Sequence, residues 1–136
     1  MSQKFASATR QLVALRANFR CEYCRKPEFA ANFIFHIEHI ISRQHGGSDY
    51  PDNLAYACSN CNWKKGPNIS TVLFEKGPIL PLFNLRKDLW FEHFSVQNGV
   101  IYSQTDIGEG TLLLLDFNSV DRIMERIELV DAGVYP

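Results

Sequence analysis

The sequence predicts an α+β protein in which a hairpin and a short helix are held together by a metal site, with a C-terminal α+β extension. Two observations predict this fold. Four cysteines stand in two C-x-x-C pairs, Cys21/Cys24 and Cys58/Cys61, and the stretch between the pairs, 25–57, is long enough to form a hairpin that brings them together. Beyond the second pair, strand-like and helix-like segments follow without a linker long enough to separate domains.

Helix and strand patterns flank the first cysteine pair. Apolar residues at helical spacing predict a helix over 7–18, with Ser7 as its cap. Aromatic and β-branched residues that alternate with polar ones predict a strand over 33–41. A loop rich in Gly, Asp and Asn, 45–53, then separates this strand from a short second strand, 54–58.

A short helix is expected directly after the second strand. Its N-cap is expected at Ser59 and its C-cap at Gly66. The character of the sequence changes after this glycine, because the following segment is rich in proline and loop-forming residues. We therefore expect a core over 1–66 and an extension over 67–136 that packs on the core within the same domain.

The extension mixes strand and helix patterns. A hairpin is expected over 90–104, because Asn98-Gly99 is a strong turn signal between two strand-like runs. The segment 105–117 fits a strand and a helix equally well. The segment 119–133 predicts a closing helix.

Composition and charge narrow the class of protein. With 136 residues, 46% of them hydrophobic and 21% charged, the chain has the make-up of one soluble globular domain. No apolar run approaches the ~20 residues that a membrane span needs. The N-terminal segment has no apolar stretch suited to a signal peptide, so the expected location is cytoplasmic.

The charges are unevenly distributed along the chain. The net charge is −1, but residues 1–66 hold nine Lys or Arg and five Asp or Glu, whereas 67–136 hold five and ten. A polyanion would be drawn to the first half, although uneven placement by chance in a short chain explains the numbers equally well.

The four cysteines predict a structural zinc site. Each C-x-x-C pair places two thiolates about 3–4 Å apart, which suits two corners of a zinc tetrahedron. With sulfur at all four corners the site is closed, so it has no position for an activated water, and the free energy of metal binding becomes free energy of folding. Four buried free cysteines and an iron–sulfur cluster are the alternatives.

The motifs CEYC, FHIEHII, HGG and PDNLAYACSNCNWKKG follow one another from Cys21 to Gly66. Together they resemble the HNH endonuclease family in its cysteine-bearing form. The rest of the chain, from PNIS through PLFN and WFEHF to the closing helix, is similar to a group of small stand-alone HNH proteins. The resemblance implies a ββα-metal (His-Me finger) core, stabilised by the four-cysteine zinc over 1–66, with 67–136 as its extension.

The resemblance also implies roles for the polar residues between and after the cysteine pairs. His39 matches the general base of the motif, and Asn53 matches the middle Asn, whose amide braces the loop between the strands. Asn62 matches the last position, where the family holds a metal with His or Asn. Glu38 stands where the family usually has Asp, so it departs from the pattern by one methylene but keeps the oxygen ligand.

The chemistry of phosphodiester hydrolysis agrees with these residue types. It needs an activated water and a cation that stabilises charge on the phosphoryl oxygens. Glu38 and Asn62 offer hard oxygen ligands suited to a single Mg²⁺ or Mn²⁺ ion, with Ni²⁺ as a further possibility. His36 lies two residues before Glu38, so both point to one face of a strand, and it is either a further metal ligand or phosphate contact, or a histidine packed beside the site.

Four further side chains are candidate DNA contacts. Lys64 and Lys65 follow Asn62 on the short helix and could hold phosphates, as could Arg43 and His45 from the loop. For each of them, plain exposure to solvent or a place in the loop is the competing interpretation.

The resulting hypothesis is a metal-dependent endonuclease that hydrolyses DNA phosphodiester bonds. The resemblance to the HNH family implies products with 5′-phosphate and 3′-hydroxyl ends. We expect it to grip the phosphate backbone more than to read bases. A non-catalytic zinc module that binds nucleic acid or protein is the first alternative, and it would not need Glu38, His39, Asn53 and Asn62 together. A cysteine-based redox or metal sensor is the second, disfavoured because one closed site uses all four thiols.

Overall fold

The computed structural model describes residues 5–136, and the chain divides into two compact units, Met1–Pro67 and Asn68–Pro136. The division falls one residue after the boundary expected from the sequence. Residues 1–4, which the sequence assigns to the first unit, lie outside the described residues. The packing of one unit on the other stays a prediction. Among the described residues, no helix is long and apolar enough to cross a membrane.

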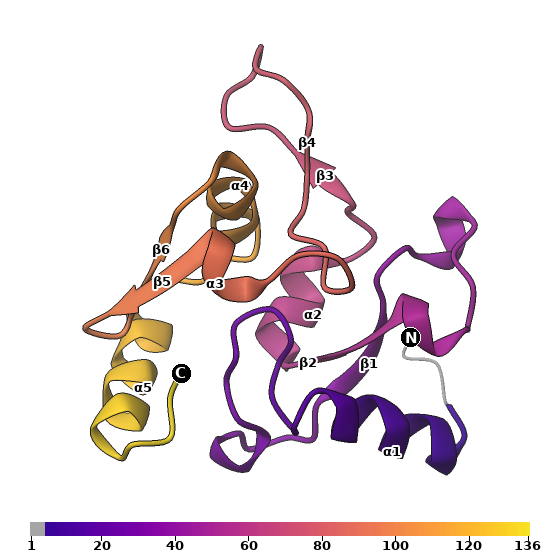
Figure 1. The fold of residues 1–136 in the computed structure, drawn as a ribbon, viewed down its shortest axis with the longest axis horizontal. Coiled ribbons are helices and arrows are strands. Elements are labelled where there is room, and N and C mark those ends of the chain that lie inside the picture. The colour runs from indigo at the N-terminus through magenta and orange to yellow at the C-terminus, as the bar shows by residue number, and fades with distance from the viewer. Residues whose placement is uncertain (1–4) are drawn as a thin grey trace. The chain divides into compact units, whose positions relative to one another are not determined.

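The first unit is a hairpin preceded and followed by a helix. Strands β1 and β2 pair antiparallel, with His36 opposite Ala57 and His39 opposite Leu54 (Figure 1). Helix α2 begins two residues after β2 ends, so hairpin and helix form one continuous segment. The elements of this unit are α1 (Ser7–Arg16), a 3-10 helix (Glu28–Ala30), β1 (His36–His39), two further 3-10 helices (Arg43–His45 and Pro51–Asn53), β2 (Leu54–Ala57) and α2 (Ser59–Lys65).

Strand β2 is the centre of the first unit. All four of its residues are buried, whereas β1 is buried only at Glu38. Helix α1 packs against β2, and the turn that carries the first cysteine pair bonds to its free edge, because Glu22 accepts from the Tyr56 amide and donates its own amide to the Tyr56 carbonyl. Burial of each large apolar side chain here contributes about 1.5–3 kcal/mol.

Two of the expected helix caps are wrong and one is confirmed. Ala6 is the N-cap of α1, without a side-chain hydrogen bond, so Ser7 is the first residue of the helix rather than its cap. Cys58 is the N-cap of α2, because its Sγ accepts from the Cys61 amide at 3.5 Å. Ser59 therefore lies inside the first turn. Gly66 ends the helix as expected, with a φ of 50° that glycine adopts without strain.

The second unit contains two short hairpins and three helices. The hairpin β5–β6 turns at Asn98 and Gly99, both at positive φ, which confirms the turn expected from these two residues. The ambiguous segment 105–117 contains a helix, whose N-cap Thr105 accepts from the Gly108 amide at 3.0 Å. The elements are β3 (Ser70–Thr71), β4 (Leu80–Pro81), α3 (Trp90–His93), β5 (Phe94–Gln97), β6 (Val100–Ser103), α4 (Asp106–Leu114) and α5 (Val120–Asp131).

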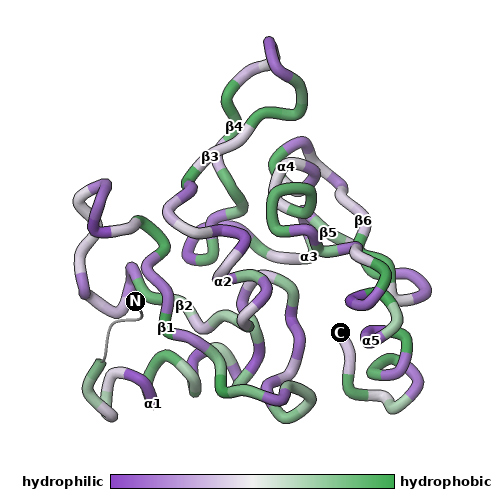
Figure 2. Tube along the Cα trace, turned by 180° about the vertical axis from the view of Figure 1, so that it is seen from behind, coloured by the Kyte–Doolittle hydropathy of each residue, from purple (hydrophilic) through white to green (hydrophobic). Residues whose placement is uncertain are grey.

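The core of the second unit is aromatic and is tied to α5 by a buried arginine. Phe94 contacts the ring of Phe117, and both side chains are fully buried. Arg126 of α5 donates to the Gly99 carbonyl of the β5–β6 turn at 2.6 Å and to Asn118. The loop between β3 and β4 has a hydrophilic tip with hydrophobic segments on either side, as Figure 2 shows.

Candidate active site

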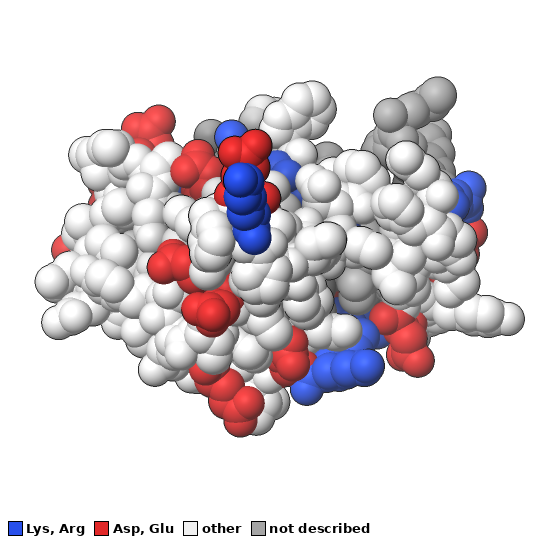
Figure 3. Space-filling view, turned by 90° about the horizontal axis from the view of Figure 1, so that it is seen from above, with Lys and Arg blue, Asp and Glu red and all other residues white. Residues whose placement is uncertain are grey.

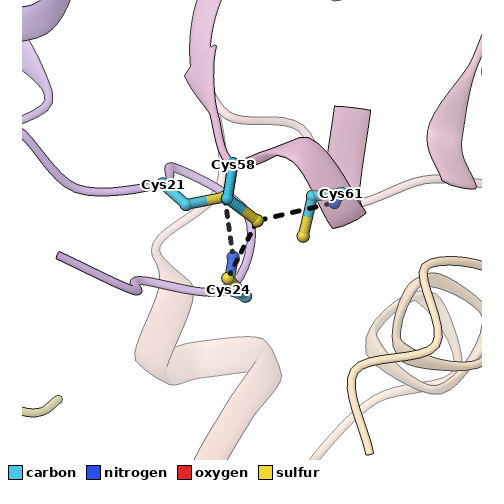
Figure 4. A group of neighbouring side chains, drawn as sticks. All are labelled: Cys21, Cys24, Cys58 and Cys61. Carbon is cyan, nitrogen blue, oxygen red and sulfur yellow. Dashed lines mark hydrogen bonds between the residues drawn. The ribbon is translucent and has the colours of Figure 1, made fainter. Parts of the chain in front are cut away.

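The four cysteines converge on one buried point. Cys21 and Cys24 come from the turn beside β2, Cys58 from the end of that strand and Cys61 from α2, and their side chains point toward one another (Figure 4). All four Sγ atoms lie within 4.8 Å of one another, and those of Cys24 and Cys58 are 3.7 Å apart. The cluster is therefore positioned to bind a metal ion, as the paired spacing predicts.

The sulfur geometry suits a tetrahedral ion. Four sulfurs at the usual zinc–sulfur distance of about 2.3 Å define a tetrahedron with edges of about 3.8 Å. Burial raises the pKa of the Cys21 and Cys61 thiols well above the ordinary value, since thiolates packed together without a cation are unfavourable. A bound cation reverses that preference and holds the thiolate form.

An open cavity of about 990 Å³ lies on the same hairpin-and-helix segment, and β1, the following loop and α2 all line it. The predicted catalytic and metal-binding residues His36, Glu38, His39 and Asn62 share this cavity with Arg43. The structure thus brings together the carboxylate, the imidazole and the amide that the sequence singles out.

The carboxylate of Glu38 is buried at the floor of this region and already has two partners. Its Oε2 accepts from the Tyr23 hydroxyl at 2.7 Å, and its Oε1 lies 2.6 Å from Nζ of Lys65. Burial raises the pKa of Glu38, and the nearby ammonium and hydroxyl oppose that rise. The two groups tie β1 to α2 and to the first cysteine turn.

Lys65 is therefore wrong as an expected DNA contact. Its side chain is 2% exposed, and its Nζ also donates to the His39 carbonyl at 3.1 Å. An ammonium enclosed in this way cannot reach a phosphate, because α2 turns residue 65 toward the hairpin. The neighbouring Lys64, about 100° further round the helix, is exposed and stays a predicted phosphate contact.

His39 is oriented by an acidic residue that the sequence reasoning missed. Its Nε2 lies 2.8 Å from Oδ1 of Asp49, and Arg43 donates from Nη2 to the other oxygen of that carboxylate at 2.6 Å. The hydrogen bonds from His39 and Arg43 lower the pKa of Asp49 to about 2, so the carboxylate is ionised at neutral pH. An acidic residue in the loop after a predicted base is the signal that could have identified it.

Asn53 braces the loop between the strands, in the geometry that its expected role requires. Its Oδ1 accepts from the Ile41 amide at 2.9 Å, and its Nδ2 donates to the carbonyls of Ile41 and Ser48, both at 2.8 Å. Gly47 makes this loop possible, because a Cβ at that position would lie 1.7 Å from the Ile41 carbonyl oxygen. Asn53 itself does not line the cavity, so it acts through the loop rather than on substrate.

The remaining predicted residues lie at the surface of the same unit. His36 lines the cavity and its Nε2 is 3.1 Å from the Ser59 hydroxyl, so one ring nitrogen is engaged. His45 is exposed in a 3-10 helix and does not line the cavity. Figure 3 shows that, on the face drawn, Lys and Arg side chains occur singly or in small groups near acidic ones rather than as one basic patch.

Two side chains of the cavity carry oxygens of the type that hard divalent cations prefer, the Glu38 carboxylate and the Asn62 amide. Glu38 Oε1 accepts no hydrogen bond in good geometry although it is buried, and a carboxylate oxygen beside one cation keeps further lone pairs. Asn62 adds a neutral oxygen from the same cavity. The Lys65 ammonium competes for the same carboxylate, so a cation here would share Glu38 with it.

Comparison with known families identifies the segment that carries both sites. Residues 21–68 match the family model described as HNH endonuclease. The match begins at the first cysteine and ends just beyond α2. It therefore contains all four cysteines and every residue that lines the cavity. Neither curated proteins nor solved structures gave a match.

Proposed function

We propose, from the premise that residues 21–68 carry an HNH endonuclease domain, that the protein is a metal-dependent endonuclease that hydrolyses DNA phosphodiester bonds. The observation that carries the proposal is the shared cavity of Glu38, His39 and Asn62 beside the buried cysteine cluster. The order of hairpin, α2 and cysteine cluster along the chain supports a ββα-metal arrangement as part of this proposal.

His39 is the proposed general base. Its Nε2 is held by Asp49, so when this nitrogen carries the proton the other ring nitrogen, Nδ1, keeps its lone pair for a water. Asn53 fixes the loop that carries Asp49, and therefore acts on the base through two hydrogen-bonded steps. Proton transfer to a positioned imidazole contributes roughly 10²–10⁴-fold to a rate.

Glu38 and Asn62 are the residues proposed to hold a catalytic Mg²⁺ or Mn²⁺ ion, with His36 as a third donor. Such an ion supplies charge stabilisation on the phosphoryl oxygens and the leaving oxygen. Tyr23 and Lys65 each hold one oxygen of the Glu38 carboxylate, which fixes the orientation of that side chain. Arg43, His45 and Lys64 are proposed to grip the phosphate backbone, and contacts of this kind position DNA without reading its sequence.

Zinc is the ion proposed for the four cysteines, in a structural role. Cys58 and Cys61 belong to the first turn of α2, and Asn62 follows directly, so the metal fixes where the second half of the catalytic site begins. Cytosolic cysteine pairs of this spacing bind zinc rather than form disulfides. None of the four thiols is joined in a disulfide in the structure, in agreement with that assignment.

The alternative is a zinc-stabilised module that binds nucleic acid or a protein without cleaving. Binding alone does not require an imidazole that is oriented by a carboxylate, as His39 is by Asp49, or a second carboxylate, Glu38, in the same cavity. The paired contacts His39–Asp49 and Glu38–Lys65 therefore favour the enzyme.

A nicking assay tests the proposal. Purified protein is incubated with supercoiled plasmid in Mg²⁺ or Mn²⁺, alongside His39→Ala and the histidine control His93→Ala, which lies outside residues 21–68. Nicking that needs the added cation and is lost only in His39→Ala supports the enzyme. If His39→Ala keeps its bound metal and its circular dichroism spectrum, the loss of nicking is a loss of catalysis and not of folding. Plasmid binding without cleavage by the wild-type protein selects the module.

A further inference from the structure

An exposed tryptophan stands on the rim of the proposed catalytic cavity. Trp63 on α2 is 83% exposed, and it lines the same cavity as His39 and Asn62. Tryptophan more often buries most of its large ring in a protein. An indole left open at the edge of a cavity lined by hydrolytic side chains is therefore a candidate for contact with substrate.

The neighbours of Trp63 leave space for a flat ligand. Gly66 and Pro67 directly follow α2, and both line the cavity with Trp63. A Cβ built on Gly66 would meet nothing closer than 3.9 Å, and that atom is the Trp63 carbonyl oxygen. The end of α2 thus places an indole and a proline ring on the lining of one cavity, with open space at Gly66.

Both ends of α2 are anchored, so the backbone that carries Trp63 is held in place. Cys58 and Cys61 belong to the metal-binding cluster at the first turn, and Lys65 is held by the buried Glu38 carboxylate in the last turn. Because α2 is already ordered, it loses little conformational freedom when a ligand binds, which favours affinity.

We propose that Trp63 stacks on an unpaired nucleobase next to the scissile phosphate, so that the preferred substrate is single-stranded DNA or a single-stranded segment joined to duplex. The inference rests on the proposed endonuclease function and names its substrate class. In a duplex the faces of each base are covered by its neighbours, so only an unpaired base offers a face to the indole. Stacking of this kind changes affinity by roughly tenfold to a hundredfold for each base.

The charge around Trp63 favours a nucleic acid over a protein partner. Arg43, which also bonds Asp49, is exposed and lines the same cavity, and Lys64 is exposed and adjacent to Trp63 in the sequence of α2. Cations that flank an aromatic face are the usual arrangement for tracking a single strand, with phosphates on the cations and bases on the ring. An apolar protein surface would place no negative groups beside these two cations, whereas a nucleic acid would.

Tryptophan fluorescence tests the inference without catalysis. The chain has two tryptophans, and Trp90 is buried, so quenching by a short oligonucleotide reports Trp63. The His39→Ala protein, without added divalent cation, is titrated with a single strand and with the matching duplex. We expect the single strand to quench the exposed emission and to bind more tightly than the duplex.

Substitutions in the same background complete the test. Binding by the variants is followed through the anisotropy of a dye-labelled oligonucleotide, because those at residue 63 lack the Trp63 emission. Trp63→Ala is expected to weaken single-strand binding by about tenfold to a hundredfold while duplex binding stays the same, and Trp63→Phe is expected to retain most of the affinity. Phe33→Ala, which removes another exposed aromatic that does not line the cavity, is the matched control and is expected to change nothing.

Three results would overturn the inference: equal quenching by single strand and duplex, unchanged single-strand affinity in Trp63→Ala, and no response to either oligonucleotide. The nicking assay fails or succeeds independently of these results. Stacking without any cleavage by the wild-type protein would remove the endonuclease proposal and leave a single-strand-binding module, whereas cleavage without stacking would leave the endonuclease and remove its proposed preference.

Discussion

Asp49 holds His39 by a 2.8 Å contact between Oδ1 and the imidazole Nε2, and Arg43 holds the other carboxylate oxygen at 2.6 Å. The carboxylate thus has one oxygen for the imidazole and one for the guanidinium. Because the pKa of Asp49 is lowered to about 2, the carboxylate stays charged at any pH at which the protein would be assayed. His39 is therefore both oriented and restricted to one tautomer when neutral.

Removal of the Asp49 carboxylate is expected to slow catalysis without loss of binding. Substitution of groups that orient a catalytic or metal-bound imidazole commonly costs about 10–100-fold, and we expect a fall of that order in kcat for Asp49→Ala, with KM nearly unchanged. Asp49→Asn keeps an oxygen that accepts from Nε2–H and is expected to recover part of the rate. Steady-state nicking kinetics measure both effects.

Asp52→Ala is the control for this prediction, because Asp52 is an exposed acid three residues further along the same loop and has no bond to His39. Its kcat is expected to match the wild type. A fall of equal size in both alanine variants would show that the loop needs negative charge in general and would remove the specific role of Asp49.

Loss of one cysteine ligand is expected to unfold the first unit. Cys61→Ser leaves three thiols at a site that the first turn of α2 shares, and the free energy of metal binding is part of the free energy of folding. We expect the zinc content, measured by elemental analysis, to fall from about one ion per chain toward zero, with loss of cooperative thermal unfolding. Incubation of the wild type with a strong chelator is expected to have the same effect.

Ser59→Ala is the matched control in the same turn of α2, since Ser59 is exposed and is not the N-cap. It is expected to keep its zinc. A fully folded and metal-free Cys61→Ser protein would mean that the cluster is four packed thiols and not a structural metal site.

The sequence predicts well the features that depend on a few neighbouring residues. The cysteine pairs, the Gly66 helix end and the turn at Asn98 and Gly99 are local, and the structure confirms each of them. The segment 105–117 could not be assigned, because a run of leucines fits a strand and a helix alike, and the Thr105 cap that decides the matter is a single weak signal.

The site residues that the sequence could not place depend on how elements pack. Lys64 and Lys65 are adjacent and chemically equal, but they lie about 100° apart around α2, and only the position of the hairpin determines which one is buried. Asp49 reaches His39 only because Gly47 and Asn53 fold the loop back on the strand. Neither the burial of Lys65 nor the contact between Asp49 and His39 can be recognised from a sequence motif with fixed spacing.

Lys65 is expected to be essential for stability and Lys64 is not. Lys65→Met leaves the Glu38 carboxylate buried without its cation, and breaking a buried ion pair in this way typically costs about 3–5 kcal/mol. Lys64→Met changes an exposed side chain and is expected to shift stability by no more than about 0.5 kcal/mol. Urea denaturation monitored by circular dichroism compares the two variants. Equal stability of the variants would show that the pair makes no net contribution.

Asn53 is expected to affect the rate more than the stability. Asn53→Asp keeps the oxygen that accepts from the Ile41 amide but loses both donations from Nδ2, to Ile41 and to Ser48. Because these carbonyls lie near the surface, water can replace the lost donors, so we expect only a small change in melting temperature. The loop that carries Asp49 loses its brace, so kcat is expected to fall. A variant with wild-type kcat would make the brace irrelevant to catalysis.

Tyr56 gives the first unit a specific weakness at alkaline pH. Its hydroxyl donates to the Glu28 carboxylate at 2.7 Å, and burial first, then the nearby carboxylate, raise its pKa to about 12. In the unfolded chain a tyrosine ionises near pH 10. The stability that Tyr56 contributes is therefore fully present below about pH 10 and is lost as the pH rises through about 12.

Tyr56→Phe removes this titration and is the test. The free energy of unfolding is measured by denaturation at pH 9 and again at pH 11.5 for both proteins, and the wild type is expected to lose more between the two values than the variant does. Part of the loss will remain in Tyr56→Phe, because burial also raises the pKa of Tyr23 well above its ordinary value. Like-charge repulsion makes the contact with Glu28 unfavourable once Tyr56 is ionised. An identical loss in both proteins would therefore mean that the Tyr56–Glu28 contact is absent in solution.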